Sequence, residues 1–115
     1  MTILDTSVVI DKVKLRKPIN EDVTAVTLVE YPKIVYYKYF YGGIIFPIKQ
    51  DFILAHRLQL VLLKIGKPQA FSDLLIAAIV INRDEELITR DQDFNYIAKA
   101  AEKLRYSMKV KIIQP

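Results

Sequence analysis

The sequence has 115 residues and no cysteine, which predicts one domain over residues 1–115 without disulfide bonds or thiolate metal sites. No apolar stretch reaches the roughly 18 residues of a membrane span, and Asp5 precedes the first apolar run without a basic segment. We therefore expect a cytoplasmic protein with neither a membrane partner nor a secretory signal. The formal net charge of +4 suits a polyanionic partner.

Taken in chain order, apolar runs and capping residues predict strands that alternate with helices. The expected elements are a strand over 2–4, a helix over 7–15 capped by Thr6 or Ser7, a strand over 23–26, a helix over 27–41, an extended connection over 44–48, a helix from Asp51 to Ile65, a helix from Asp73 to about Arg83 capped by Ser72, a strand over 87–89, a helix from Phe94 to about Leu104 and a strand over 110–113. This alternation predicts an α/β fold with a parallel sheet of about four strands flanked by helices.

Punctuating residues support several of these limits. Thr27 and Glu30 have the spacing of a capping box, and Gly66 followed by Pro68 is typical of a helix end. The run from 74 to 81 is apolar all round, which predicts a buried helix.

Five acidic side chains are expected at one edge of this sheet, because ligands of parallel sheets bind beyond the carboxyl ends of the strands. They are Asp5 after the first strand, Glu30 in the first turn of a helix, Asp73 at a helix start, and Asp91 and Asp93 after the strand over 87–89.

Structural explanations compete for three of these acids. Glu30 would complete the capping box, Asp73 would favour a helix N-terminus, and Asp93 would cap the last helix. Asp5 and Asp91 have no such role available. Unpaired acids that face one point repel one another at a cost of several kcal/mol, which a divalent cation would remove.

Oxygen ligands favour Mg²⁺ or Mn²⁺ over zinc. The single histidine, His56, falls in the middle of a predicted helix far from the acids, where a half-exposed structural residue is expected. Such a site indicates metal-assisted phosphodiester hydrolysis with one or two ions. The chain has no Gly-rich phosphate loop, which argues against a nucleoside triphosphatase.

The motifs LDTSVVID, TLVEY, SDLLIAAIVI and LITRDQDF follow one another in an order that resembles the PIN-domain family, and VapC-type toxin ribonucleases in particular. The resemblance implies a single Rossmann-like domain and an Mg²⁺- or Mn²⁺-dependent endoribonuclease (a hydrolase) with an RNA substrate and a VapB-like antitoxin. It matches Asp5, Glu30, Asp73 and Asp91 to an acidic quartet, Asp93 to an accessory acid, and Thr6 or Ser7 and Thr89 to supporting hydroxyls.

Two alternatives keep this fold: a stand-alone PIN nuclease, and a non-catalytic module that binds RNA or protein without an antitoxin. The segment from Tyr31 to Gly66 is short for the family, and Tyr-Pro-Lys follows Glu30, so the RNA target does not transfer. A phosphorylated receiver domain is disfavoured because no lysine closely follows Thr89.

Aromatic and basic residues supply two further predictions. The aromatics of the expected helix over 27–41 predict a homodimer or higher homo-oligomer, with Tyr36, Phe40 and Tyr37 as the alternative core face. The predicted interface residues are Tyr36, Tyr37, Tyr39, Phe40 and Tyr41. The predicted RNA phosphate contacts are Arg90, Lys33, Lys67 and Lys38.

Overall fold

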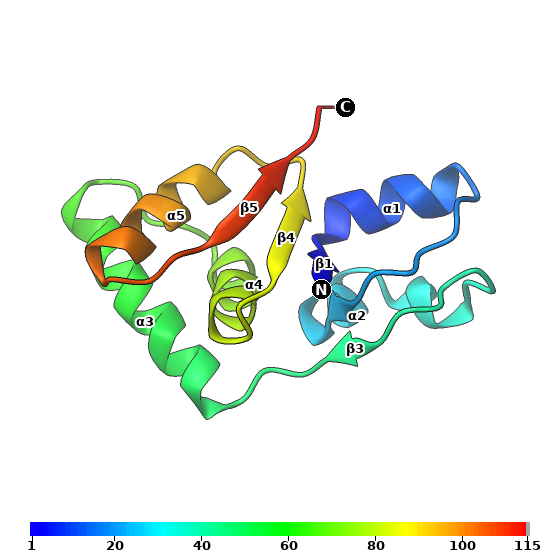
Figure 1. The fold of residues 1–115 in the computed structure, drawn as a ribbon, viewed down its shortest axis with the longest axis horizontal. Coiled ribbons are helices and arrows are strands. Elements are labelled where there is room, and N and C mark those ends of the chain that lie inside the picture. The colour runs from blue at the N-terminus through cyan, green and yellow to red at the C-terminus, as the bar shows by residue number, and fades with distance from the viewer. Residues whose placement is uncertain (115) are drawn as a thin grey trace.

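The computed structural model describes residues 1–114 and contains strands and helices in alternation (Figure 1). The elements are β1 (Thr2–Leu4), α1 (Thr6–Lys14), β2 (Val23–Thr24), α2 (Ala25–Glu30), the 3₁₀ helix η1 (Pro32–Tyr36), β3 (Ile44–Ile45), α3 (Lys49–Lys64), α4 (Phe71–Asn82), β4 (Glu86–Thr89), α5 (Phe94–Lys103) and β5 (Lys109–Ile112).

Every pair of neighbouring strands is parallel, as predicted. One sheet has the order β1-β4-β5, and β2 and β3 form a second sheet of two strands. A bridge between Ile3 and Asp22 links β1 to the chain before β2, through hydrogen bonds of 2.9 Å from the Leu4 N–H and 3.1 Å to the Thr2 carbonyl. The predicted sheet of about four strands is therefore wrong in detail: the described residues form sheets of three and two strands.

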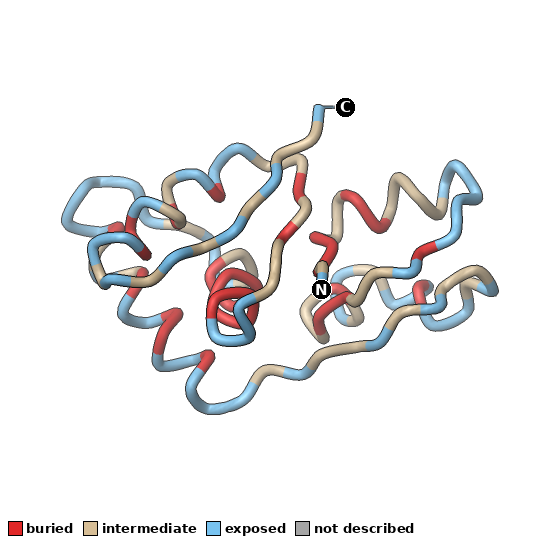
Figure 2. The backbone as a smooth tube through the Cα atoms, in the orientation of Figure 1, coloured by how far each residue is buried: buried red, intermediate tan, exposed pale blue. Residues whose placement is uncertain are grey.

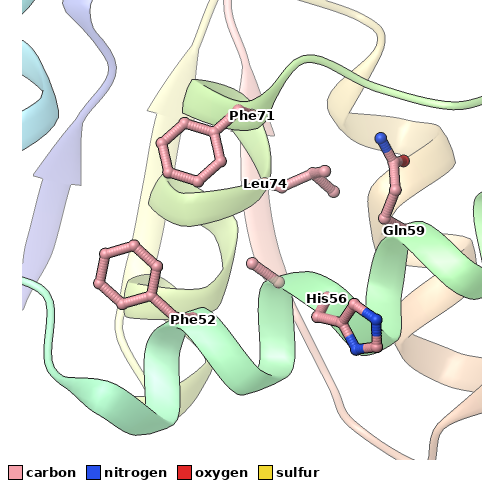
Figure 3. A pocket seen from close by; sticks show the side chains of 6 residues that line it. Phe52, His56, Gln59, Phe71 and Leu74 are labelled. Atoms are coloured by element: carbon pink, nitrogen blue, oxygen red, sulfur yellow. The ribbon is translucent and has the colours of Figure 1, made fainter.

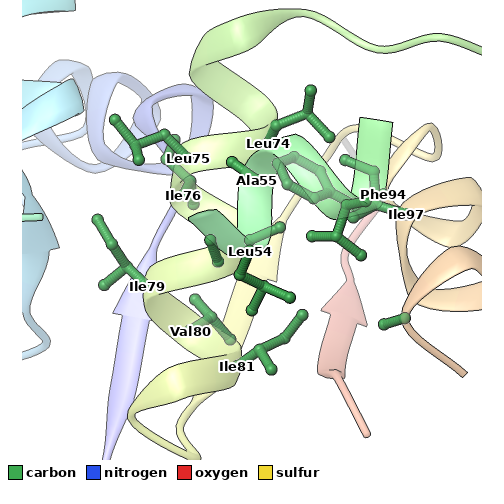
Figure 4. Packing of buried hydrophobic residues seen from close by; sticks show 14 of the residues in the cluster. Leu54, Ala55, Leu74, Leu75, Ile76, Ile79, Val80, Ile81, Phe94 and Ile97 are labelled. Atoms are coloured by element: carbon green, nitrogen blue, oxygen red, sulfur yellow. The ribbon is translucent and has the colours of Figure 1, made fainter. Parts of the chain in front are cut away.

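Alternate side chains of β1 and β4 face two separate hydrophobic clusters, as the pleat of a strand requires. Ile3 and Leu87 pack with α3, α4 and α5, whereas Leu4 and Ile88 pack on the side of α1. Figure 2 shows the buried backbone of α4 in the middle of the molecule, and Figure 4 shows its apolar side chains surrounded by other helices. The prediction of a buried helix over 74–81 is confirmed.

The predicted helix over 27–41 is wrong, because Pro32 ends it. Helix α2 begins at Ala25 and ends at Glu30, and Thr24 accepts a 3.2 Å hydrogen bond from a backbone N–H of its first turn. Proline has no N–H and excludes helical geometry from the residue before it, and Tyr31 accordingly has φ −137° and ψ 72°. The chain continues as a short 3₁₀ helix.

The aromatic residues after Pro32 consequently share no single helical face. Tyr36 is 86% exposed, so its predicted place in the core is wrong, and Ile34 is buried there instead. Tyr37 and Phe40 do pack against the cluster on the α1 side, as predicted. The Tyr37 hydroxyl also donates a 2.6 Å hydrogen bond to the Lys17 carbonyl.

Two predicted helix caps are also wrong, although the helices themselves are present. Ile48 precedes α3, and Asp51 is its third residue, whose carboxylate accepts a 2.8 Å hydrogen bond from the Ile48 N–H. Helix α4 begins at Phe71, so Ser72 lies inside the helix and does not cap it. The predicted end of α3 at Gly66 is confirmed by its positive φ of 73°.

The close approach of Gly42 to a neighbouring backbone gives a test of this packing. A Cβ atom on Gly42 would lie 1.8 Å from the Glu21 carbonyl oxygen, whereas a Cβ on Gly43 would lie 3.3 Å from the Asp22 side chain. We expect Gly42→Ala to lower the free energy of unfolding by about 2–3 kcal/mol and the matched Gly43→Ala by less than about 1 kcal/mol. Urea denaturation of both variants measures this, and equal losses would contradict the packing.

Candidate functional site

Asp5 occupies the point where β1 ends and α1 begins. Its Oδ1 accepts a 2.9 Å hydrogen bond from the Thr6 N–H, so Asp5 caps α1 and the predicted caps Thr6 and Ser7 are wrong. By the alternation of the strand, Asp5 lies on the same face as Ile3, the face that α4 covers. The side chain therefore points from the sheet edge toward the helix that carries Asp73.

The second oxygen of Asp5 is held by hydroxyl groups. Its Oδ2 accepts hydrogen bonds from Thr89 Oγ1 at 2.8 Å and Ser7 Oγ at 3.3 Å, and the residue is only 7% exposed. Burial raises the pKa of the Asp5 carboxyl; the hydrogen bonds from Thr89, Thr6 and Ser7 oppose this rise, and the negative charge of Glu30 adds to it. Two strands and a helix thus position one carboxylate.

A chain of hydroxyls connects this region to Glu30. Thr6 Oγ1 donates to Glu30 Oε1 at 2.7 Å and lies 2.8 Å from Thr27 Oγ1. Because a threonine hydroxyl has a single proton, Thr27 must donate to Thr6. The predicted capping box of Thr27 and Glu30 is therefore wrong: Glu30 is the last residue of α2 and lies exposed, and Thr27 is buried.

The two acids of LITRDQDF have different surroundings. The Asp91 N–H donates to Thr89 Oγ1 at 3.0 Å, and Asp91 Oδ1 accepts from the Asp93 N–H at 2.9 Å. Asp93 holds the predicted position before α5, but its side chain makes no capping hydrogen bond. The predicted capping hydrogen bond of Asp93 is therefore wrong: the side-chain acceptor before α5 is Asp91, which is half-buried, while Asp93 is exposed.

Asp73 is the acid whose pKa is affected by the charges of all four others. It is the third residue of α4, and burial raises its pKa to about 6, with further contributions from the charges of Asp5, Asp91, Glu30 and Asp93 in that order. Within residues 1–114, however, no three histidine, cysteine or acidic side chains lie close enough together to hold a metal ion as they stand. Like charges favour such separation, so binding of one ion by three of the acids requires side-chain rotation.

The single histidine lies away from these carboxylates. His56 is exposed on α3 and lines an apolar pocket together with Phe52 and Phe71, from whose rings its imidazole points away (Figure 3). Asp51 is a further buried acid, but it accepts hydrogen bonds from Ile48 and from Asn82 Nδ2, which is a structural role. The candidate metal ligands around Asp73 are thus carboxylate and hydroxyl oxygen atoms.

The four predicted phosphate contacts lie in different surroundings. Arg90 forms an ion pair with Asp11 of α1, a contact between residues 79 positions apart that sequence reasoning missed. The Lys38 ammonium lies 5.1 Å from the Tyr39 ring centroid, and the Lys67 ammonium 5.2 Å from that of Tyr96. Lys33 is exposed on η1. Contact of these residues with RNA stays a prediction.

The comparisons with known proteins concern the fold. No family model and no curated protein matches the sequence. A chain of the DNA-bound VapBC from Salmonella typhimurium superposes with a TM-score of 0.77 at 16% identity, covering 96% of both chains. The chain has the PIN fold of VapC-type proteins. VapBC-1 from nontypeable Haemophilus influenzae gives 0.72 at 18% identity and 96% of both chains.

A third structure extends this likeness to the ends of the chain. VapBC-5 from Mycobacterium tuberculosis, a member of the VapBC family of toxin–antitoxin systems, gives a TM-score of 0.68 at 24% identity over 99% of this chain and 98% of the other. The predicted Rossmann-like PIN fold is thereby confirmed. Within residues 1–114, each helix is too short or too polar to cross a membrane.

The raised pKa of Asp73 predicts that the metal-free protein gains stability as the pH falls. The folded-state pKa of about 6 exceeds the ordinary 3.8, so the protonated form is favoured by folding. The gain begins as the pH falls through about 6 and is complete below about 4; solvent screening limits it to about 1 kcal/mol. Melting curves in EDTA should show this gain, and Asp73→Asn should remove it and be more stable than wild type at pH 7. A pH dependence equal to that of wild type in Asp73→Asn would contradict the assignment.

The hydrogen bond between Asp91 and Asp93 separates the structural roles of these two acids. Asp91→Ala removes an acceptor and should cost about 1 kcal/mol of stability, whereas Asp91→Asn keeps one and should cost less. Asp93→Ala should change stability by less than about 0.5 kcal/mol, because its carboxylate caps nothing. Thermal melts at pH 7 in EDTA decide this; a larger loss in Asp93→Ala than in Asp91→Ala would restore Asp93 as the cap.

Proposed function

We propose that the protein is a metal-dependent endoribonuclease and the toxin of a toxin–antitoxin pair. The observation that carries the proposal is the group of five acids at the carboxyl edge of the sheet, where burial and the charges of the other four acids raise the pKa of Asp73. A cluster of this kind is unfavourable in a folded protein unless a cation compensates it.

The donor atoms fit Mg²⁺ or Mn²⁺. Carboxylate oxygens suit hard divalent ions, and threonine and serine hydroxyls orient them. We assign metal binding to Asp5, Asp73, Asp91, Glu30 and Asp93. When bound, such an ion would supply Lewis-acid stabilisation of the charge that develops on a phosphodiester.

The protein groups would prepare this site by fixing the acids in different degrees. Asp5 is held by Thr89, Thr6 and Ser7, so its orientation is set before any ligand enters. Glu30 is tied only through the Thr6 hydroxyl and is otherwise exposed, which leaves it able to move toward a ligand. We therefore propose Asp5 as the fixed ligand and Glu30 as an adjustable one.

The proposed partner is a small VapB-like antitoxin. The similar structures are VapBC complexes, and one is described as belonging to a family of toxin–antitoxin systems. A basic side chain of such a partner could satisfy the acids as a cation does. Under this proposal the antitoxin and the metal compete for the same carboxylates.

One observation favours a second candidate, a non-catalytic PIN module. The carboxylates around Asp73 do not converge on one point as they stand. A module that has lost metal binding would keep the fold and the hydroxyl network. Metal-dependent cleavage distinguishes the two candidates.

RNA cleavage in Mn²⁺ tests the nuclease directly. Wild-type protein should cleave generic single-stranded RNA in Mn²⁺ and lose the activity in excess EDTA. Asp5→Asn should lower the rate by at least about 100-fold, because metal-assisted stabilisation is worth several kcal/mol. The control Glu102→Gln, an exposed acid on α5, should cleave as wild type does. Full activity in EDTA, from a preparation free of other nucleases, would contradict the proposal.

Growth of an expressing bacterium tests the toxin role separately. Expression of the wild type alone should arrest growth, and Asp5→Asn should relieve the arrest while the folded protein accumulates. Co-expression of a small reading frame adjacent to the gene should restore growth and yield a complex with the chain. Cleavage in vitro without arrest would favour the stand-alone nuclease.

A homodimer or higher homo-oligomer stays a prediction, as does its interface at residues 36–41, and the structure offers a second candidate surface. The large exposed apolar residues of α3 and its flanks are Phe46, Ile48, Phe52, Ile53, Leu60, Leu63 and Ile65. If the chain is a dimer by light scattering, Phe52→Glu should weaken it more than Tyr41→Glu. The reverse order would return the interface to residues 36–41.

A further inference from the structure

A groove outside the acidic site runs between α1 and the end of β5. Val8 of α1, Leu15 directly after that helix and Ile113 after β5 form its apolar part. In Figure 1 the chain after β5 runs upward past the tip of β4. The cavity measures about 480 Å³, which is within the range that accommodates small-molecule groups such as a nucleotide.

The charged side chains of this groove are mostly basic. Lys12, Lys14, Lys17 and Arg90 line it, and Asp11 is the one acid among its lining residues. Asp11 pairs with Arg90, and Lys12 lies 3.9 Å from Glu21 at its edge. Since the whole chain carries a net charge of +4, much of that excess is gathered here.

The edge strand β5 extends the basic surface. The register pairs Glu86 with Lys109 and Ile88 with Lys111, so both lysines lie on the same face of the sheet as Ile88, the face of α1. Both lysines are exposed, and Lys109 forms a 3.1 Å ion pair with Asp84. A stripe of positive charge therefore follows β5 toward the groove.

The groove and the acidic site meet at the end of β4. Arg90 lies between Thr89, which holds Asp5, and Asp91. Five carboxylates repel a polyanion, so a substrate that carries phosphates needs compensating positive charge beside them. Asp11 occupies part of the Arg90 guanidinium, whose five N–H donors leave others for phosphate oxygens.

We infer that this groove binds the phosphate backbone of single-stranded RNA and presents the strand to the acidic site. The inference rests on the proposed function and names Lys12, Lys14 and Lys17 as phosphate contacts, with Arg90 as the residue between groove and acids. RNA is favoured over an acidic peptide because the groove is lined by Arg90, which lies at the end of β4 next to Thr89 and Asp91, where the proposed phosphodiester would bind.

Binding of a labelled single-stranded RNA in EDTA tests the groove without catalysis. The variant K12Q/K14Q/K17Q keeps polar side chains of similar length and helix propensity but removes three charges. Its dissociation constant at about 0.1 M salt should rise at least 10-fold, and the slope of log affinity against log salt should fall by about 2. The matched control K49Q/K64Q/K103Q replaces three exposed lysines on α3 and α5 and has the same net charge as K12Q/K14Q/K17Q. Its dissociation constant should stay within about 2-fold of that of wild type.

Equal weakening by both triple variants would overturn the groove, because it would show a response to net charge alone. Melting curves exclude loss of folding as the cause. They are measured for the triple variants and for the double variant K14E/K17E, which changes only two exposed positions. An acidic peptide that displaces the RNA at equal charge would overturn the choice of ligand. Cleavage by wild type in Mn²⁺, with no binding defect in K12Q/K14Q/K17Q, would refute the groove and leave the nuclease standing. RNA binding that depends on the groove lysines, without any cleavage in Mn²⁺, would refute the nuclease and leave the groove standing.

Discussion

The buried carboxylate of Asp5 joins the ends of two strands to the start of a helix, and the candidate site depends on this junction. Its two oxygens accept hydrogen bonds from the α1 backbone and from hydroxyls of α1 and β4. Such bonds offset the cost of burying a charge, which would otherwise be several kcal/mol. The parallel arrangement of β1 and β4 makes the junction possible, because only then do both strands end at the same edge.

Everything else at that edge is arranged around this charge. Thr89 donates to Asp5 and accepts from the Asp91 backbone, so one hydroxyl positions two acids. Thr6 caps no helix itself, but its hydroxyl donates a hydrogen bond to Glu30 and so holds this acid near the others. The electrostatic cost of placing these acids together is seen at Asp73, where burial and the neighbouring charges raise the pKa to about 6. In the proposed binding mode, the basic groove would balance the negative field of these acids for a polyanionic ligand.

Local signals were enough to predict much of the fold. The alternation of strands and helices, the apolar run of α4 and the stop at Gly66 each depend on residues near in sequence. The same holds for four of the five acids, since Asp5, Asp73, Asp91 and Asp93 each follow a strand end or lie at the start of a helix; Glu30, which ends α2, is the exception. Pro32 was also a local signal, but the capping-box spacing of Thr27 and Glu30 outweighed it and extended the helix wrongly.

Long-range partners account for the predictions that failed. The Thr27 hydroxyl bonds to Thr6, 21 residues away, and this contact replaces the expected capping box. The Arg90 pair with Asp11 likewise joins segments that no periodicity connects. Only a continuous helix over 27–41 would place Tyr36 in the core. Because Pro32 ends that helix, Ile34 is buried there instead. Sequence patterns identify which residues carry charge, but side-chain partners decide where that charge is held.

The acids around Asp73 are proposed to form a site for a hard divalent cation. Anomalous diffraction from crystals soaked in Mn²⁺ tests it most directly. We expect one peak about 2.1 Å from a carboxylate oxygen of Asp5, with a second ligand from Asp73 or Asp91 rotated toward it. Absence of a peak at this edge, with Asp5 still fully hydrogen-bonded to Thr89 and Ser7, would contradict the account.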